Sequence, residues 1–170
     1  MPESTTERHD VAGAEQLLPL TRSQLDIWLA QETGGSGIPW QASYFVVIDG
    51  AVEPALVERA VHRAIADCEP LRAAVIEANG QVYQKVVDCP AVPVPFLDLS
   101  GSPDPVAETN RLASQIQREP MSWAGPLFRF ALFRTGAHQS LLFACLHHIV
   151  VDGFSSVLLF NRIAPVYSAI

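Results

Sequence analysis

The sequence of 170 residues has few cysteines and no long hydrophobic run. Its three cysteines, Cys68, Cys89 and Cys145, are an odd number at wide spacing without a Cys-x-x-Cys pair. This pattern argues against a disulfide framework or a zinc site and favours reduced thiols in a cytoplasmic protein. No apolar run follows a basic N-terminal segment, and the longest apolar stretches are far too short to span a bilayer, so we expect neither a signal peptide nor a membrane anchor.

Positive charge is also scarce. Lysine and arginine number 11 against 18 aspartates and glutamates, which gives a formal net charge of -7. A nucleic acid or an anionic membrane would select a basic surface, so neither is expected as a partner. Apolar residues, in contrast, make up 49% of the chain and charged residues 17%. This composition predicts one globular unit, because it is too apolar for disorder and too short for two ordinary domains.

The N-terminal region divides into a polar segment and a first helix. Residues 1–16 lack apolar periodicity, and we expect them to form a flexible tail before the folded part, which covers 17–170. Thr21 and Gln24 match a capping box, which predicts a helix that begins after Thr21. The glycine cluster at 34–37 is expected to end that helix.

Strands and helices follow in mixed order. Asn79-Gly80 favours the left-handed conformations of a tight hairpin turn between strands over 73–78 and 81–87. Prolines near 94–99 predict an edge strand there. Residues 140–148 are apolar almost throughout, as expected for a strand covered on both faces. The other predicted elements are strands at 43–49 and 127–134, and helices that begin at Pro54, near Pro105 and after Gly153, the last one kinked or ended by Pro165.

Polar residues that can titrate follow the apolar strand, in the segment His147-His148-Ile149-Val150-Val151-Asp152-Gly153. Such residues are costly at the end of a buried strand unless they are paired. Because side chains alternate along a strand, one histidine should be packed and hydrogen-bonded and the other should face a cavity. This geometry argues against one metal ion bound by both. An imidazole that titrates at about pH 6.5 can accept or position a proton.

The spelling HHIVVDG resembles the HHxxxDG signature of condensation domains from nonribosomal peptide synthetases. Residues 18–31 (LPLTRSQLDIWLAQ) look like the opening motif of that family. Residues 67–75 (DCEPLRAAV) look like its motif Arg-His-Glu-x-Leu-Arg-Thr, with departures at Asp67-Cys68 and Ala73. The resemblance covers 17–170. It implies an α/β fold similar to chloramphenicol acetyltransferase, an α+β sandwich in which helices cover a mixed sheet.

The resemblance also implies a role for each residue of the signature. His148 falls on the position regarded as catalytic, as a general base or as the group that positions the attacking amine. His147 and Asp152 fall on structural positions of the loop, and Gly153 lines the approach to the histidine. We expect Asp152 to pair with an arginine, and Arg72 is the motif arginine that could serve unless the partner lies outside this chain. No metal is implied.

The implied activity is amide-bond formation between two carrier-bound groups. Family members have two such lobes with the histidine in a tunnel between them, and this chain resembles the N-terminal lobe. The expected partners are therefore a donor carrier protein, an acceptor carrier domain, the C-terminal lobe and an adenylation domain. Phosphopantetheine would belong to the carriers, and this lobe would bind no cofactor. We expect the isolated lobe to be inactive.

Several features resemble starter condensation domains. If Met1 is the natural start, the donor carrier acts in trans. Trp40 stands where elongating domains commonly show an asparagine, which makes it either a donor-side channel residue or an ordinary core aromatic. Residues 79–84 and 151–155 look like starter domains of enterobactin- and bacillibactin-type siderophore synthetases, which join a dihydroxybenzoyl group to an amino acid. A fatty-acyl starter is the close rival.

Three other functions stay open. An epimerisation domain would share this lobe. A stand-alone acyltransferase would use a coenzyme A thioester and share the His-x-x-x-Asp core. A non-catalytic condensation-like domain would recruit a partner protein, but such domains usually lose the second histidine or the glycine, and this chain keeps His148 and Gly153.

Overall fold

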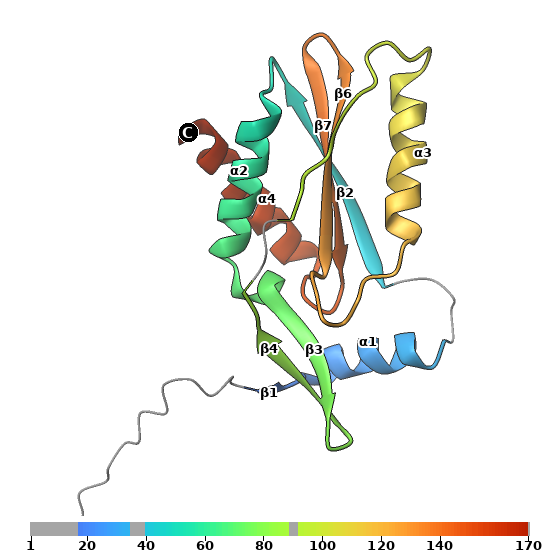
Figure 1. Ribbon diagram of the computed structural model, residues 1–170, viewed down its shortest axis with the longest axis vertical. Helices are drawn as coiled ribbons and strands as arrows, with labels where there is room; N and C mark the ends of the chain where they lie inside the picture. The colour runs from blue at the N-terminus through green and yellow to red at the C-terminus, as the bar shows by residue number, and fades with distance from the viewer. Residues whose placement is uncertain (1–16, 35–39, 89–91, 170) are drawn as a thin grey trace, which may run out of the picture.

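The computed structural model of the chain describes residues 17–34, 40–88 and 92–169. They form a four-stranded sheet with helices on both faces and a smaller three-stranded sheet at one end of it (Figure 1). The tail predicted at 1–16, two of the three glycines expected to end the first helix, and Cys89 lie outside the described residues. Within those ranges no helix combines the length and the hydropathy that crossing a bilayer requires.

The larger sheet has the strand order β2-β7-β6-β5. β5 runs parallel to β6, whereas the other pairs are antiparallel, so the sheet is mixed as the family resemblance implies. β5 is an edge strand, as its flanking prolines predict, and the Pro95 carbonyl accepts from the Leu132 N–H at 2.9 Å. The strands are β2 (Gln41–Asp49), β5 (Phe96–Asp98), β6 (Phe128–Gly136) and β7 (Gln139–His147).

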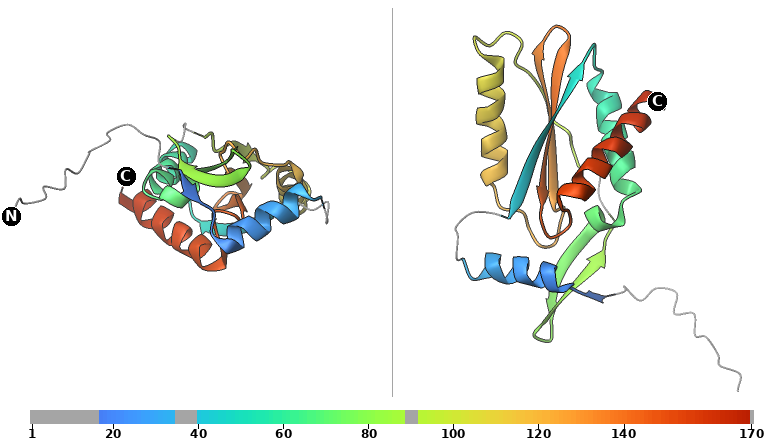
Figure 2. Two further views of the ribbon diagram at one scale, coloured as in Figure 1. Left: turned by 90° about the horizontal axis from the view of Figure 1, so that it is seen from below. Right: turned by 180° about the vertical axis from the view of Figure 1, so that it is seen from behind.

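Three helices cover this sheet (Figure 2). α2 (Pro54–Ala66) and α4 (Gly153–Ala169) lie on one face, and α3 (Pro105–Arg118) lies on the other. Side chains of β6 and β7 alternate between the two faces, so each face has its own apolar cluster. All residues of β7 from Leu142 to His147 are buried, which confirms that this strand is covered on both sides.

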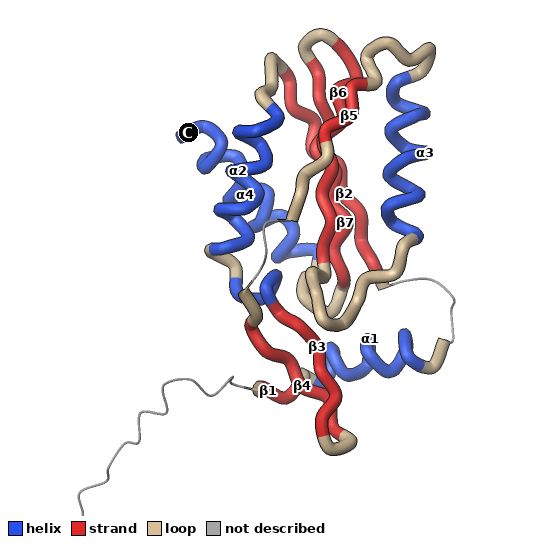
Figure 3. Tube along the Cα trace, viewed as in Figure 1, coloured by secondary structure: helices blue, strands red, loops and turns tan. Residues whose placement is uncertain are grey.

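The smaller sheet has the order β1-β4-β3. Asn79 and Gly80 have φ values of 52° and 72° and form the two-residue turn between β3 and β4, as predicted. α1 lies beside this sheet, below the end of β7 (Figure 3). The elements of this part are β1 (Leu18–Pro19), α1 (Arg22–Glu32), a short 3₁₀ helix (Glu69–Arg72), β3 (Ala73–Ala78) and β4 (Gln81–Val86).

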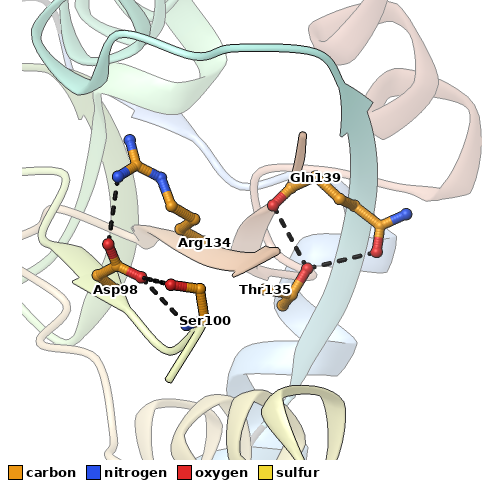
Figure 4. A network of polar contacts seen from close by, with 5 residues as sticks. All are labelled: Asp98, Ser100, Arg134, Thr135 and Gln139. Atoms are coloured by element: carbon orange, nitrogen blue, oxygen red, sulfur yellow. Dashed lines mark hydrogen bonds and ion pairs between the residues drawn. The ribbon is translucent and has the colours of Figure 1, made fainter. Parts of the chain in front are cut away.

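A polar network lies at the end of the larger sheet that is opposite the histidines (Figure 4). Asp98 accepts hydrogen bonds from the Ser100 hydroxyl at 2.6 Å and from the Ser100 N–H at 3.0 Å, and Arg134 donates to it at 3.2 Å. The Ser100 hydroxyl and N–H, followed by Arg134, lower the pKa of the Asp98 carboxyl. This network fastens β5 to β6 and has no part in the histidine segment.

The end of α4 departs from the sequence prediction. The helix continues through Pro165 to Ala169, so the expectation that Pro165 could end it is wrong. Proline removes one N–H donor from the helix, but the residues on either side are held by packing. Ile163 is buried in the cluster beneath α2 and α4, and Val166 and Tyr167 pack against that cluster. These contacts offset the missing hydrogen bond.

Candidate functional site

The segment 147–153 connects β7 to α4 and forms a tight turn beside α1 and the start of β2. The His147 carbonyl accepts from the N–H groups of Val150 at 3.1 Å and Val151 at 3.3 Å. The His148 N–H donates to the Trp40 carbonyl at 2.8 Å. These backbone bonds give the segment a defined shape, because each holds a different part of the turn.

His147 is fully buried and makes two hydrogen bonds through its ring. The Ile149 N–H donates to Nδ1 at 3.1 Å, so the ring proton lies on Nε2 and is donated to Gln31 Oε1 at 3.0 Å. The Trp123 ring packs edge-on at a centroid distance of 5.0 Å. Burial, followed by the nearby His148, lowers the pKa of His147 to about 4. His147 is therefore neutral and structural at physiological pH.

His148 has the opposite environment. It is exposed, and within the described part of the chain its imidazole makes no hydrogen bond or ion pair. The burial and hydrogen bonds of His147 confirm the prediction that one of the two histidines is packed. That the other histidine, His148, faces a cavity stays a prediction. Across the described ranges, no group of three or more His, Cys, Asp and Glu side chains could hold a metal ion.

Asp152 caps α4. Its carboxylate accepts from the N–H of Ser155 at 2.7 Å and from the Ser155 hydroxyl, while its own N–H donates to that hydroxyl at 2.8 Å. The hydroxyl of Ser155, followed by its N–H, lowers the pKa of the Asp152 carboxyl. This arrangement satisfies N–H groups that the start of a helix otherwise leaves unpaired.

The predicted ion pair between Asp152 and Arg72 is wrong for the described chain. None of the ion pairs among the described residues joins them. Arg72 lies at the end of the 3₁₀ helix, where its Nε is buried without a hydrogen-bond partner. Ser155, three residues along the chain, supplies the hydrogen bonds to Oδ1 of Asp152, whereas Arg72 lines a pocket with Asp88 and Pro126.

Gly153 is the last residue of the histidine segment, and Trp40, although far away in the sequence, contacts it through its backbone. Gly153 is the first residue of α4, and a Cβ built there would meet no atom within 4 Å. Neither its backbone conformation nor packing inside the described chain therefore requires a glycine. Trp40 precedes β2, accepts the His148 N–H through its carbonyl, and is 38% exposed, which does not fit an ordinary core aromatic.

Four residues around the turn escaped the sequence analysis in these roles. Gln31 and Trp123 surround the His147 ring, and Ser155 holds Asp152. Gln24 forms the predicted capping box but also donates to the Ile149 carbonyl at 3.0 Å. One signal was available, since Gln24 and Gln31 are seven residues apart and therefore lie on the same face of a helix.

Comparisons with known proteins point to one family. A family model for the condensation domain matches residues 14–170. Enterobactin synthase component F of Shigella flexneri is 31% identical over 158 residues, which cover 91% of this chain and 12% of that protein. Isonitrile lipopeptide synthase of Streptomyces coeruleorubidus is 32% identical over 156 residues, which cover 89% of this chain and 10% of that protein.

Solved structures show the same fold. The starter condensation domain of rhizomide synthetase superposes with a TM-score of 0.84 at 32% identity, covering 91% of this chain and 39% of that one. The first condensation domain of the CDA synthetase gives 0.83 at 29% identity, covering 92% and 41%. The chain thus spans about two fifths of these domains and a smaller share of the curated relatives. Since the family model matches nearly its whole length, the chain belongs to the condensation-domain family.

Proposed function

We propose that this chain, over residues 17–170, is the N-terminal lobe of an amide-bond-forming condensation domain. The reaction passes an acyl group from a donor carrier thioester to the amine of an aminoacyl group on a second carrier. The observation that carries the proposal is the contrast between His147 and His148. His147 is buried, neutral and fixed by two hydrogen bonds, and the adjacent His148 is exposed, with no hydrogen bond or ion pair from its imidazole in the described part.

In the proposed reaction the main task of the protein is to position the amine beside the thioester carbonyl. A thioester is already activated, so holding amine and carbonyl together supplies much of the rate. The amine nitrogen attacks the thioester carbon, the carbon–sulfur bond breaks, and the donor carrier leaves as a thiolate. His148 positions the amine or takes the proton that it loses. The phosphopantetheine arms belong to the carriers, and this lobe contributes no cofactor of its own.

Two residues beside His148 fit an approach path for the carrier arms. Gly153 leaves open space at the start of α4, where any side chain would project beside the turn. We assign Trp40 to the donor side, because its backbone contacts His148 and its side chain is only partly covered. Asp152 and Ser155 support the path by fixing the first turn of α4.

The outer face of α4 fits a contact with the second lobe. Phe154, Val157 and Leu158 are 73%, 55% and 52% exposed, which is high for adjacent apolar side chains on one helix. α4 begins directly after the histidine segment, so a lobe that covers this face would also enclose His148. The other partners in this proposal are the donor carrier in trans, the acceptor carrier and an adenylation domain.

The isolated chain is expected to form no condensed product, because one wall of the substrate tunnel is then missing. The measurement compares this chain with the full-length synthetase at equal concentration, with loaded donor and acceptor carriers, by mass spectrometry of the acceptor. The full-length protein should acylate the acceptor. Turnover by the isolated chain near the full-length rate would contradict the two-lobe account.

The donor group is the least constrained part of the proposal. Similarity to enterobactin synthase component F agrees with the aryl donor that the sequence resemblance implies. A fatty-acyl donor is the second candidate, because a double mutant of the starter condensation domain of rhizomide synthetase was crystallised in complex with C8-CoA and Leu-SNAC. The same complexes also raise the coenzyme A thioester as a donor form.

A competition experiment tests the function and the donor together. The full-length synthetase receives aryl-loaded and fatty-acyl-loaded donor carriers and a fatty-acyl coenzyme A, each in a different isotope form, and the intact mass of the acceptor carrier is recorded. We expect the aryl mass gain. A fatty-acyl gain from the carrier would keep the reaction and change the donor, and a gain from coenzyme A alone would support the acyltransferase alternative. No gain with verified carriers would favour a different donor group or a binding-only domain.

A further inference from the structure

The side-chain amide of Gln24 joins three separate parts of the chain. Gln24 and Gln84 form a reciprocal amide pair, with Nε2-to-Oε1 distances of 3.1 Å in both directions. Gln24 Oε1 also accepts the Thr21 N–H at 2.9 Å, and its Nε2 donates to the Ile149 carbonyl at 3.0 Å. Both donors and both lone pairs of the amide are therefore used, linking α1, β4 and the histidine turn.

Gln31 repeats this arrangement two helical turns further along α1. Its Oε1 accepts the Nε2 proton of His147 at 3.0 Å. α1 has no fully buried residue, although Ile27 and Trp28 pack against the apolar cluster on the α3 face of the larger sheet. Its next residue, Glu32, accepts from the Trp123 indole N–H at 2.7 Å, and Trp123 packs on the His147 ring. Polar contacts at both ends of α1 thus converge on the histidine turn.

The two glutamines hold the residues immediately before and after His148. Gln31 bonds to the side chain of His147, and Gln24 bonds to the carbonyl of Ile149. We propose that Gln24 and Gln31 are positioning residues that fix the point from which His148 acts. This inference rests on the proposed function, because it assumes that the His148 imidazole meets the substrate.

Loss of either contact should reduce turnover more than substrate binding. A displacement of about 1 Å at a reacting group can cost on the order of 10²-fold in rate. We expect Gln24→Met and Gln31→Met each to lower kcat about 10-fold or more, with little change in KM for the acceptor carrier. Methionine keeps the length of the side chain and removes the amide. Gln115→Met, at an exposed position of α3, is the matched control and should leave both constants unchanged.

A second variant separates positioning from general support of the fold. In Gln31→Glu the carboxylate can still accept the Nε2 proton, so the rate at alkaline pH should stay near that of the wild type. The new charge also favours protonated His147, whose Nδ1 then carries a proton and can no longer accept the Ile149 N–H. The rate should therefore fall at a higher pH than in the wild type.

The other titratable and charged groups on the elements packed around His147 are unchanged in this variant. They include His148 and Cys145, which are close to it in sequence, Arg22, Asp26 and Glu32 on α1, and Arg129 on β6. An upward shift of the acidic limb in Gln31→Glu can therefore be assigned to the new carboxylate. Gln31→Met, which adds no charge, should be slow at every pH without such a shift.

All variants are measured in the full-length synthetase with loaded carriers, alongside His148→Ala. A slow His148→Ala with glutamine variants that behave like Gln115→Met, and a Gln31→Glu profile that overlays the wild type, would overturn this inference alone. A His148→Ala variant as fast as the wild type would overturn the proposed function instead. Slow methionine variants, unchanged KM and the shifted profile are the results that support positioning.

Discussion

Replacing His148 by alanine should lower the rate of acyl transfer by about 10²–10⁴-fold, the usual contribution of a positioned acid–base group. The substitution should lower the rate and leave the stability of the fold nearly unchanged. His148 is exposed, and its ring makes no hydrogen bond within the described residues, so alanine removes little that stabilises the native state. Turnover should not vanish, because the proposed two-lobe enzyme would still hold the thioester and the amine together.

The measurement is the initial rate of acceptor acylation by full-length proteins, followed by mass spectrometry, with thermal unfolding as the check on folding. His138→Ala is the matched control. His138 is also exposed and lies in the turn between β6 and β7, at the opposite end of the same strand pair. We expect the control to keep the wild-type rate. Equal rates for His148→Ala and His138→Ala would show that His148 takes no part.

Acidification should destabilise the chain through His147 well before the carboxylates protonate. In the folded state the pKa of His147 is about 4, against about 6.5 for an unfolded histidine. At about pH 8 the His147 ring is uncharged in the folded and in the unfolded state, so its titration does not affect the free energy of unfolding. As the pH falls below about 6.5, His147 becomes protonated in the unfolded state but stays neutral in the folded state. The free energy of unfolding therefore decreases until about pH 4, where the folded state also binds the proton.

The expected size is about 2 kcal/mol of unfolding free energy lost at His147 between about pH 8 and about pH 5. The pKa values of the Asp98 and Asp152 carboxyls are lowered in the folded state, so their loss of stability comes at lower pH, outside this window. The measurement is urea unfolding of this chain at the two pH values, compared with His147→Asn, which keeps an acceptor near the Ile149 N–H and does not titrate.

His147→Asn should be less stable than the wild type at about pH 8, because it loses ring packing against Trp123. Its unfolding free energy should nevertheless change less between the two pH values. Parallel pH dependence in the two proteins would mean that His147 titrates normally in the folded state. The structural role assigned to the buried neutral ring would then be wrong.

The local features of the fold could be predicted from the sequence because each has a short-range physical cause. Asn79-Gly80 can adopt positive φ values, which fixed the hairpin. Thr21 and Gln24 satisfy each other's N–H groups, which fixed the start of α1. The apolar run before His147 showed that β7 would be covered on both faces.

Long-range pairings could not be predicted, because no local preference selects them. The two residues of β1 pair with β4 more than sixty positions away, and β5 is parallel to β6 although a helix separates them in sequence. The failure of the Arg72 prediction has the same origin. A motif identifies an aspartate that needs a partner, but whether Ser155 or Arg72 supplies it depends on distances that only the fold sets.

The sequence predicts which residues form the candidate site, but not which distant side chains hold them in place. Side-chain alternation at the end of a buried strand predicts that His147 and His148 have different environments, and the family motif assigns the catalytic position to His148. The hydrogen bonds that hold the histidine turn come from Gln24 and Gln31 on α1, more than a hundred residues earlier in the chain. The seven-residue spacing places Gln24 and Gln31 on one face of a helix, but polar side chains on an exposed helix usually bond to water, so the spacing does not identify the histidine turn as their partner.

The central claim is that His148, in the setting described above, serves carrier-to-carrier condensation. The most direct measurement is the intact mass of the acceptor carrier after incubation with the full-length synthetase and a loaded donor carrier. The account predicts that the acceptor gains the mass of the donor group while the donor carrier loses it, and that both changes slow strongly in His148→Ala. An acceptor of unchanged mass, with both carriers verified as loaded and the protein folded, would contradict it.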